Sequence, residues 1–296
     1  MLLRVIDVLA CPWCGAGVRH VSGHVEQPHG VLTNGELACV ACGRVSEVVD
    51  GIWRAMGPWK VARTAAQISN VVPPTPQLYE RVWRHRSLTM LSGRTFPLRE
   101  ELAEMRRGAG IDALADGDIV ADIACSEGLY SREVASSGAG SGPAITVLAV
   151  DHSEAFLRRV VQRAKREKLA IVAVRASAQH LPIRAASLGA VVMGGSLNEI
   201  GDCQAAIGEM GRACRPGGHV FSMSLVRAGT ARGRVLQRLA RGGGIVFPTE
   251  TETVSMFERA GLEITDRRRD RVVLRLSATR STGVDGAAGS GPADAA

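Results

Sequence analysis

Two apolar runs that each lead to a carboxylate constrain the fold of this 296-residue chain more than any other feature. The first is Ile119-Val-Ala-Asp-Ile-Ala-Cys-Ser-Glu-Gly128, which passes from β-branched residues through an acid and small residues into a helix pattern at Leu129. The second extends from Ile145 to Val150 and is followed by Asp151. A buried parallel strand that leads into a nucleotide-binding loop has this pattern. The two runs therefore predict neighbouring parallel strands with a ligand site at their carboxyl ends.

Strand and helix patterns alternate from Asp118 onwards. We expect strands near 118–123, 145–150, 170–174, 188–194 and 218–224, helices near 129–136, 153–167, 202–214 and 254–260, and a hairpin of 262–266 with 270–276. Asp202 is the candidate N-cap of its helix. Apolar residues at helical spacing also predict helices between Tyr79 and Arg107, with a break from Gly93 to Pro97. Such alternation predicts an α/β fold, a Rossmann-like, doubly wound sheet covered on both faces.

Four cysteines near the N-terminus have the spacing of a metal site. Cys11-Pro-Trp-Cys14 and Cys39-Val-Ala-Cys42 are two C-x2-C units separated by 24 residues. A tight turn brings both thiolates of a unit to about 2.3 Å from one metal, and two units form a closed tetrahedral shell for structural zinc. Two unrelated redox or buried pairs are the alternative. Zinc bound by four thiolates would lower the formal charge of +7 to about +5.

Composition divides the chain into four parts. Residues 1–57 would form a small β-rich zinc ribbon, and 58–78, which contain four prolines, a linker. Residues 79–276 would form the α/β domain, and the Gly-, Ala- and Ser-rich residues 277–296 a disordered tail. No apolar run approaches the roughly 20 residues that span a bilayer, and Arg4 and Asp7 interrupt the apolar N-terminus. We therefore expect a cytoplasmic protein without a membrane span; its oligomeric state is unknown at this level.

The ordered motifs of residues 79–276 resemble those of class I S-adenosylmethionine (SAM)-dependent methyltransferases, in particular the type 11-like group. Ile119–Gly128 and Asp151 resemble motifs I and II, and Arg175-Ala-Ser-Ala-Gln-His-Leu-Pro182 resembles the D-A-x-x-L-P motif. Val191–Ile200 resembles the fourth motif, and Arg212-Ala-Cys-Arg-Pro-Gly-Gly218 the turn before the fifth strand. The resemblance implies SAM as the cofactor and a seven-stranded sheet.

The cysteine-rich segment has a resemblance of its own. Leu9-Ala-Cys-Pro-Trp-Cys-Gly15 and Leu37-Ala-Cys-Val-Ala-Cys-Gly-Arg44 resemble the zinc ribbon of the small activator subunits of tRNA and protein methyltransferases. In ribosomal RNA guanine-N1 methyltransferases an N-terminal zinc module also helps to grip RNA. There the second ligand pair is usually wider and includes a histidine, whereas here it is C-x2-C.

The methyltransferase resemblance also implies a set of cofactor contacts. Asp151 lies where a carboxylate binds the ribose hydroxyls, with helix capping as the alternative use, and His152 would lie beside the adenine or ribose. Ala124 and Ser126 replace two glycines of the family's D-x-G-x-G-x-G loop, and Glu127 would add a negative charge near the cationic cofactor. The expected cofactor-binding residues are Tyr79, Asp122, Ala124, Ser126, Gly128, Asp151, His152, Ser177, Ala178 and Gly194, with Ser177 in place of the family's adenine-binding acid.

Catalytic groups are less well marked. Asn198, Glu199 and His180 are candidates for proton transfer, and each has a loop or capping role as its alternative. We expect methyl transfer to a small-molecule acceptor of natural-product, quinone or lipid-like character. An RNA methyltransferase that grips rRNA or tRNA through the ribbon and arginine-rich segments is the first alternative, less favoured because few aromatic residues are available to stack on bases. A non-methylating SAM-binding regulator or a cyclase on the same fold is the second.

Overall fold

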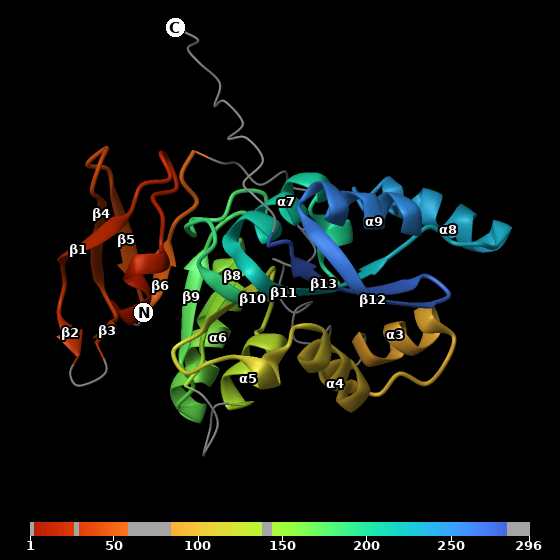
Figure 1. Ribbon diagram of the computed structural model, residues 1–296, viewed down its shortest axis with the longest axis horizontal. Helices are drawn as coiled ribbons and strands as arrows, with labels where there is room; N and C mark the ends of the chain where they lie inside the picture. The colour runs from red at the N-terminus through yellow and green to blue at the C-terminus, as the bar shows by residue number, and fades with distance from the viewer. Residues whose placement is uncertain (1–2, 27–29, 59–83, 138–143, 283–296) are drawn as a thin grey trace, which may run out of the picture.

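The computed structural model describes residues 3–26, 30–58, 84–137 and 144–282 (Figure 1). Within these ranges, eleven strands form one sheet in the order β1-β4-β5-β6-β9-β8-β7-β10-β11-β13-β12. Its C-terminal part comprises β7 (Ile119–Ile123), β8 (Thr146–Asp151), β9 (Ile171–Arg175), β10 (Leu188–Gly194), β11 (Cys214–Leu225), β12 (Leu262–Asp270) and β13 (Val273–Arg280). Strands β9, β8, β7, β10 and β11 are parallel neighbours, and β13 pairs antiparallel with β11 and β12. The predicted α/β, Rossmann-like fold is confirmed.

Helices cover both faces of this sheet (Figure 1). The helices of the described residues are α3 (Arg84–Ser92), α4 (Leu98–Gly108), α5 (Leu129–Ser137), α6 (Glu154–Glu167), α7 (Cys203–Ala213), α8 (Ala231–Arg241) and α9 (Glu250–Arg259), with short 3-10 turns η3 (Ile111–Ala113) and η4 (Leu197–Glu199); α8 lies at one end of the molecule and buries none of its residues. Val120 of β7 packs in one buried cluster with Met105 of α4 and Val134 of α5. The next residue, Ala121, packs in another cluster with Ile207 of α7. Adjacent strand residues therefore enter cores on opposite faces, as a doubly wound sheet requires.

The N-terminal residues form a β-rich module that joins the main sheet. It contains η1 (Leu3–Val8), β1 (Val18–Ser22), β2 (Val25–Glu26), β3 (Val31–Leu32), β4 (Gly35–Cys39), β5 (Val45–Val49) and β6 (Ile52–Arg54), and β2 pairs with β3 in a separate small sheet. Strand β6 pairs in parallel with β9, with Ile52 opposite Ala173. Trp53 is fully buried, its indole N–H donates to Ser46 Oγ at 2.8 Å, and it shares a cluster with Leu148 of β8. The module and the α/β domain therefore share one core.

The observed elements differ from the expected ones in three places. Helix α8 was not predicted, and β13 continues to Arg280, beyond the expected domain end at 276. The module lengthens the expected seven-stranded sheet to eleven strands among the described residues. Asp202 is confirmed as the N-cap of α7, because its side chain accepts from the backbone N–H of Ala205 at 3.0 Å. Residues 59–83 and 283–296, which hold most of the expected linker and tail, lie outside the described residues.

Within the ranges that the structure describes, no helix is both long and apolar enough to cross a membrane. The cytoplasmic location stays a prediction, because no feature of the fold tests it.

The turn between β7 and α5 adopts left-handed backbone conformation at three positions. These are Ala124 (φ 54°), Ser126 (φ 51°) and Gly128 (φ 74°). They are the three glycine positions of the loop that the sequence resembles, so the alanine and the serine retain the backbone shape of a glycine loop at a steric cost. At Gly128 a Cβ atom would also lie 3.0 Å from Val160 Cγ2 of α6. The loop therefore keeps its conformation despite its low glycine content.

We predict that Ala124→Gly stabilises the protein. Left-handed backbone costs an L-residue about 1–2 kcal/mol, and the extra freedom of glycine in the unfolded chain takes back about 0.5–1 kcal/mol. The expected net gain in the free energy of unfolding is about 0.5–1 kcal/mol, measured by denaturant titration. In contrast, Ala135→Gly in the regular helix α5 is expected to lose about 1 kcal/mol. Equal losses for both variants would contradict the strain assigned to Ala124.

Candidate active site

A cavity lies at the carboxyl ends of the central parallel strands, where α/β sheets bind their ligands. Its polar lining comes mainly from the strand ends and the loops that follow them: Asp122, Ser126, Asp151, His152, Ser196, Glu199 and Ser224. Its apolar lining comes mainly from α3, α5, α6 and the end of β11: Leu88, Leu91, Leu129, Phe156, Ile200, Met223 and Leu225. A smaller adjoining hollow is lined by residues 176–179 together with Ala124, Asp151 and His152. The lining of the combined site thus contains both a polar and an apolar set of residues.

Asp151 connects the two loops at the base of the cavity. One carboxylate oxygen accepts from the backbone N–H of Ser126 at 2.9 Å, and the other accepts from the N–H of Ser153 at 2.8 Å. Burial raises the pKa of Asp151, since removal from water disfavours the charged form. The His152 Nδ1 atom lies 3.5 Å from the same carboxylate. A carboxylate has about four acceptor sites, so Asp151 can hold both loops and still receive hydroxyl donors from a ligand.

Asp122 fastens the end of β7 to the helix that follows the loop. Its Oδ2 atom accepts from the backbone N–H of Ser131 at 2.8 Å and from the Ser131 hydroxyl at 2.6 Å. A carboxylate that accepts from backbone N–H groups at the N-terminus of a helix also interacts favourably with the helix dipole. Asp122 lines the cavity while it supports α5.

Gly194 and Tyr130 form a tight contact beside the cavity. A Cβ atom on Gly194 would lie 2.8 Å from Tyr130 Cε2, so only glycine fits there without a shift of the ring. The buried Tyr130 hydroxyl donates to Glu101 Oε1 of α4 at 2.8 Å, which fixes the ring in place. Helix α4 thereby supports the end of β10 as well as the sheet face.

The structure brings most of the expected cofactor residues together. Asp122, Ala124, Ser126, Asp151, His152 and Gly194 line the larger cavity, and Ser177 and Ala178 line the smaller hollow. Gly128 lies outside both linings and acts through the shape of the turn. Tyr79 lies outside the described residues. The Ser177 hydroxyl accepts from the backbone N–H of Gln179 at 3.2 Å, which holds the loop that forms the smaller hollow.

Of the three candidates for proton transfer, Glu199 alone lines a cavity. The buried Asn198 amide donates to the backbone oxygens of Leu225 and Val246, both at 2.6 Å, and its Oδ1 accepts from the N–H of Leu225 at 2.7 Å. His180 Nε2 lies 3.2 Å from the backbone oxygen of Pro12. Asn198 therefore ties the chain segments around β11 together, and His180 contacts the N-terminal module.

Glu127 does not place its charge beside the cofactor site, contrary to expectation. It is buried and forms ion pairs with Arg159 and with Arg163, the latter at 2.6 Å, both on α6. Arginine charges neutralise the carboxylate there. Glu127 is absent from the cavity lining, so its role is to dock the loop on α6.

Sequence reasoning missed the apolar side of the site. Leu88 and Leu91 of α3, Phe156 of α6 and Met223 and Leu225 of β11 line the cavity. The helical spacing before residue 107 and the apolar run of β11 were visible in the sequence. Nothing in those patterns separates a residue that faces a cavity from one that faces the core.

Comparisons with known proteins agree with this geometry. Residues 120–218 match a family model described as a methyltransferase domain. An uncharacterized chloroplastic methyltransferase of Arabidopsis thaliana is 27% identical over 297 residues, which cover 92% of this chain and 79% of the relative.

Among solved structures, geranyl diphosphate C-methyltransferase from Streptomyces coelicolor A3(2) aligns with a TM-score of 0.52 and 15% identity, over 62% of this chain and 78% of that chain. The (4+2)-cyclase SpnF aligns with a TM-score of 0.53 and 18% identity, over 76% of this chain and 98% of that chain. At such identities these structures support the fold alone. The methyltransferase model thus spans β7 to the start of β11, the strands whose carboxyl ends line the cavity, and a protein named a methyltransferase aligns along most of this chain.

Proposed function

We propose that the protein transfers a methyl group from SAM to an apolar small-molecule acceptor. The observation that carries this proposal is the lining of the larger cavity, to which Leu88, Leu91, Leu129, Met223 and Leu225 contribute a large apolar share. Ligand sites of this kind hold apolar molecules in apolar walls, and a few polar groups fix their orientation. A polar acceptor such as a nucleobase would leave its hydrogen-bonding groups unsatisfied against these leucines.

On the polar side we assign the cofactor to the strand ends. Asp151 would accept hydrogen bonds from the ribose hydroxyls, with His152 beside the adenine or ribose. Ser177 and Ala178 would border the adenine in the smaller hollow. Ala124 and Ser126 would lie under the methionine arm, where the left-handed backbone allows close approach.

When bound, SAM supplies a methyl group already activated by the positive sulfur, whose bonding pair stays on the sulfur when the methyl leaves. The protein's contribution is then mainly alignment of acceptor and methyl carbon, a contribution on the order of 7–11 kcal/mol in well-oriented reactions. Of the three candidates for proton transfer, Glu199 lines the cavity, so we assign to it the removal of a proton from a hydroxyl or amino acceptor. An acceptor carbon or nitrogen that carries a free electron pair would need no base.

RNA as the acceptor is less well supported. The arginines of strand β12 form ion pairs with nearby acids. Arg267 and Arg269 pair with Glu250 at 3.4 and 3.0 Å, and Arg268 pairs with Asp266 at 2.8 Å. Ion pairs of this kind lower the positive potential that an RNA backbone would meet. A cyclase or a SAM-binding regulator remains the outcome if SAM binds and no acceptor is methylated.

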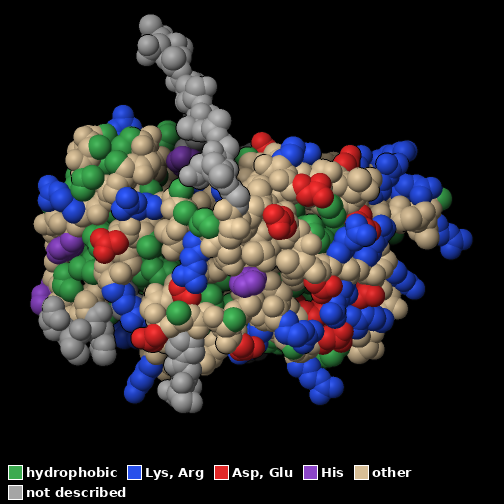
Figure 2. Space-filling view, viewed as in Figure 1, with side chains coloured by type: hydrophobic (Ala, Val, Ile, Leu, Met, Phe, Trp, Pro, Cys, Tyr) green, Lys and Arg blue, Asp and Glu red, His purple; other side chains and the backbone are tan. Residues whose placement is uncertain are grey.

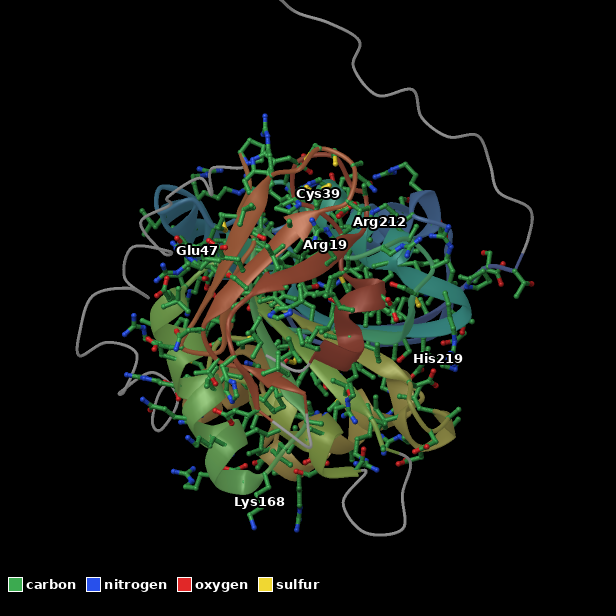
Figure 3. The ribbon with its side chains drawn as sticks, turned by 90° about the vertical axis from the view of Figure 1, so that its left-hand side faces the viewer. Arg19, Cys39, Glu47, Lys168, Arg212 and His219 are labelled. Atoms are coloured by element: carbon green, nitrogen blue, oxygen red, sulfur yellow. The ribbon has the colours of Figure 1, made fainter. Side chains whose placement is uncertain are left out.

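We further propose that Cys11, Cys14, Cys39 and Cys42 bind structural zinc. Their sulfur atoms all lie within 4.8 Å of one another, with Cys11–Cys42 at 3.7 Å and Cys14–Cys39 at 3.4 Å. Zn–S bonds of about 2.3 Å place the sulfurs of a tetrahedral site about 3.8 Å apart. The backbone N–H groups of Ala41 and Cys42 both point at Cys39 Sγ at 3.3 Å, which favours a thiolate. In Figure 3, Cys39 lies beside other sulfur atoms at one end of the module.

The first C-x2-C turn contacts the chain segment that follows the lining of the smaller hollow. Between the two C-x2-C turns and that hollow, Ala10 N donates to Pro182 O at 2.9 Å, and His180 contacts the oxygen of Pro12. Pro12 lies between the first two cysteines, and His180 and Pro182 lie in the loop that carries Ser177 and Ala178. Zinc would therefore stiffen the first turn and, through it, the adenine end of the proposed cofactor site.

The first prediction here concerns Asp151→Asn. An amide has one acceptor oxygen for the donors of two backbone groups and a ribose, so the affinity for S-adenosylhomocysteine should fall about tenfold to hundredfold. Isothermal titration calorimetry measures this affinity. Asp118→Asn is the matched control, because Asp118 precedes β7 and pairs with Arg215 at 2.5 Å, away from the cavity. Equal affinities of Asp151→Asn and the wild type would refute the ribose role.

A second prediction tests the apolar acceptor. With methyl-labelled SAM, label should enter an apolar, solvent-extractable acceptor pool from cell extract and not the RNA fraction. Leu91→Ser should raise the KM for that acceptor about tenfold or more, while SAM affinity stays unchanged. Met90→Ser is the control, because Met90 lies next to Leu91 in the sequence and its own side chain is 65% exposed. Labelling of RNA alone would overturn the assignment of the acceptor.

The third prediction concerns the metal. The purified protein should contain one zinc per chain, and removal of the zinc by a chelator should lower both the unfolding temperature and the affinity for S-adenosylhomocysteine. Cys11→Ser should reproduce both losses. Cys203→Ser changes a buried cysteine at the start of α7, outside the cluster, and should keep the zinc. An unchanged cofactor affinity after metal loss would separate the module from the site and contradict the proposed coupling.

A further inference from the structure

Helix α8 exposes a stripe of large apolar side chains. Val235, Leu236 and Leu239 are 56%, 68% and 71% exposed, and no residue of the helix is buried. Their spacing of one and four residues places them on one side of the helix. Figure 1 shows α8 at one end of the molecule, where it extends beyond α9. An apolar surface of this kind indicates a binding partner.

The polar side of α8 is the side that holds it to the protein. Gln237 Oε1 accepts from the backbone N–H of Ala228 at 2.8 Å, and Gln237 Nε2 donates to Val226 O at 2.9 Å. At 100° per residue, Gln237 lies nearly opposite Val235 and Leu239 on the helix. The helix is therefore oriented with its apolar stripe outward, the reverse of a helix that packs on a core.

Positive charge flanks this stripe. The helix carries Arg232, Arg234, Arg238 and Arg241 and no acidic residue. Figure 2 shows Lys and Arg side chains gathered at this end of the molecule. Helices that lie in the plane of a membrane interface combine an apolar face with arginine or lysine, whose stems reach past the apolar layer to phosphate groups. RNA would match the arginines and leave the three apolar side chains in water.

We propose that α8 binds the surface of a bilayer that contains anionic lipids. Val235, Leu236 and Leu239 enter the boundary between headgroups and acyl chains, and the flanking arginines contact lipid phosphates. The helix lies on the membrane and does not span it.

The connections of α8 lead directly to the active site. The segment before it begins after Leu225, which lines the cavity, and Val246 in the segment after it forms two hydrogen bonds with Asn198, at 2.6 and 2.9 Å. Binding of α8 to a membrane would hold the cavity close to the lipid phase. This last step rests on the proposed apolar acceptor, whereas membrane binding itself does not.

The test is co-sedimentation of the full chain with lipid vesicles. The wild type should bind vesicles of phosphatidylcholine with phosphatidylglycerol, and bind pure phosphatidylcholine vesicles much more weakly. The triple variant Val235→Ser, Leu236→Ser, Leu239→Ser should bind about tenfold or more weakly. Arg234→Gln with Arg238→Gln should weaken binding about fivefold per arginine and reduce its dependence on salt. Because these side chains are exposed, the unfolding temperature and the affinity for S-adenosylhomocysteine should stay unchanged in all variants.

The matched control is Val40→Ser with Val45→Ser, which removes two exposed valines from the N-terminal module (62% and 48% exposed) and should leave vesicle binding intact. Three results would overturn the proposal. The wild type does not bind anionic vesicles; the triple variant binds them as tightly as the wild type; or the triple variant only converts a dimer to a monomer in sedimentation analysis, which would make the stripe a contact between two copies of the chain. Since SAM affinity is measured in parallel, failure here is distinguishable from failure of the proposed enzyme activity.

Discussion

The buried carboxylate of Asp151 is the constraint on which the site depends. It accepts hydrogen bonds from backbone N–H groups of the loop after β7 and of the turn into α6, so one side chain sets the distance between these two segments of the cavity. Burial raises its pKa, and the two N–H groups offset part of that cost. The same bond holds the N–H of Ser126 in place and so compensates for left-handed backbone at a residue with a Cβ. A glycine-poor loop can therefore keep the conformation that glycines would adopt freely.

The N-terminal module covers an edge of the α/β sheet. Without it, β9 would be an exposed edge strand with unpaired backbone groups, which invites association with other chains. Strand β6 covers that edge by parallel pairing, and the module adds Leu9 and Trp53 to the core of the α/β domain. The module also brings the cysteine cluster near the loop that carries Ser177, because Pro12, which lies between Cys11 and Cys14, contacts His180 of that loop. The four cysteines lie far from this loop in the sequence.

The sequence predicted the features that arise from local patterns. The strands, the helices beside them, the Asp202 cap and the grouping of Asp122, Asp151 and Ser177 follow from periodicity and motif order, because the carboxyl ends of parallel strands share one edge. Contacts between residues that lie far apart in the sequence could not be predicted from it. Asn198 bonds to Val246, and His180 contacts Pro12 168 residues away; their roles in proton transfer stay predictions. Glu127 pairs with two arginines of α6, and the helical pattern of α8 is hard to recognise because its apolar residues are interspersed with arginines.

The two sides of the cavity come from different parts of the fold. The polar side is supplied by strand ends and loops, whose positions the sheet fixes. Much of the apolar lining is supplied by α3 and by the end of β11. The motifs that resemble a SAM site lie at the strand ends and loops, whereas no motif marks the apolar lining, so the sequence indicated a cofactor but no particular acceptor. Because Leu225 lines the cavity at the end of β11 and the chain then leads into α8, the strand that lines the cavity is directly followed by the helix with the outward apolar stripe.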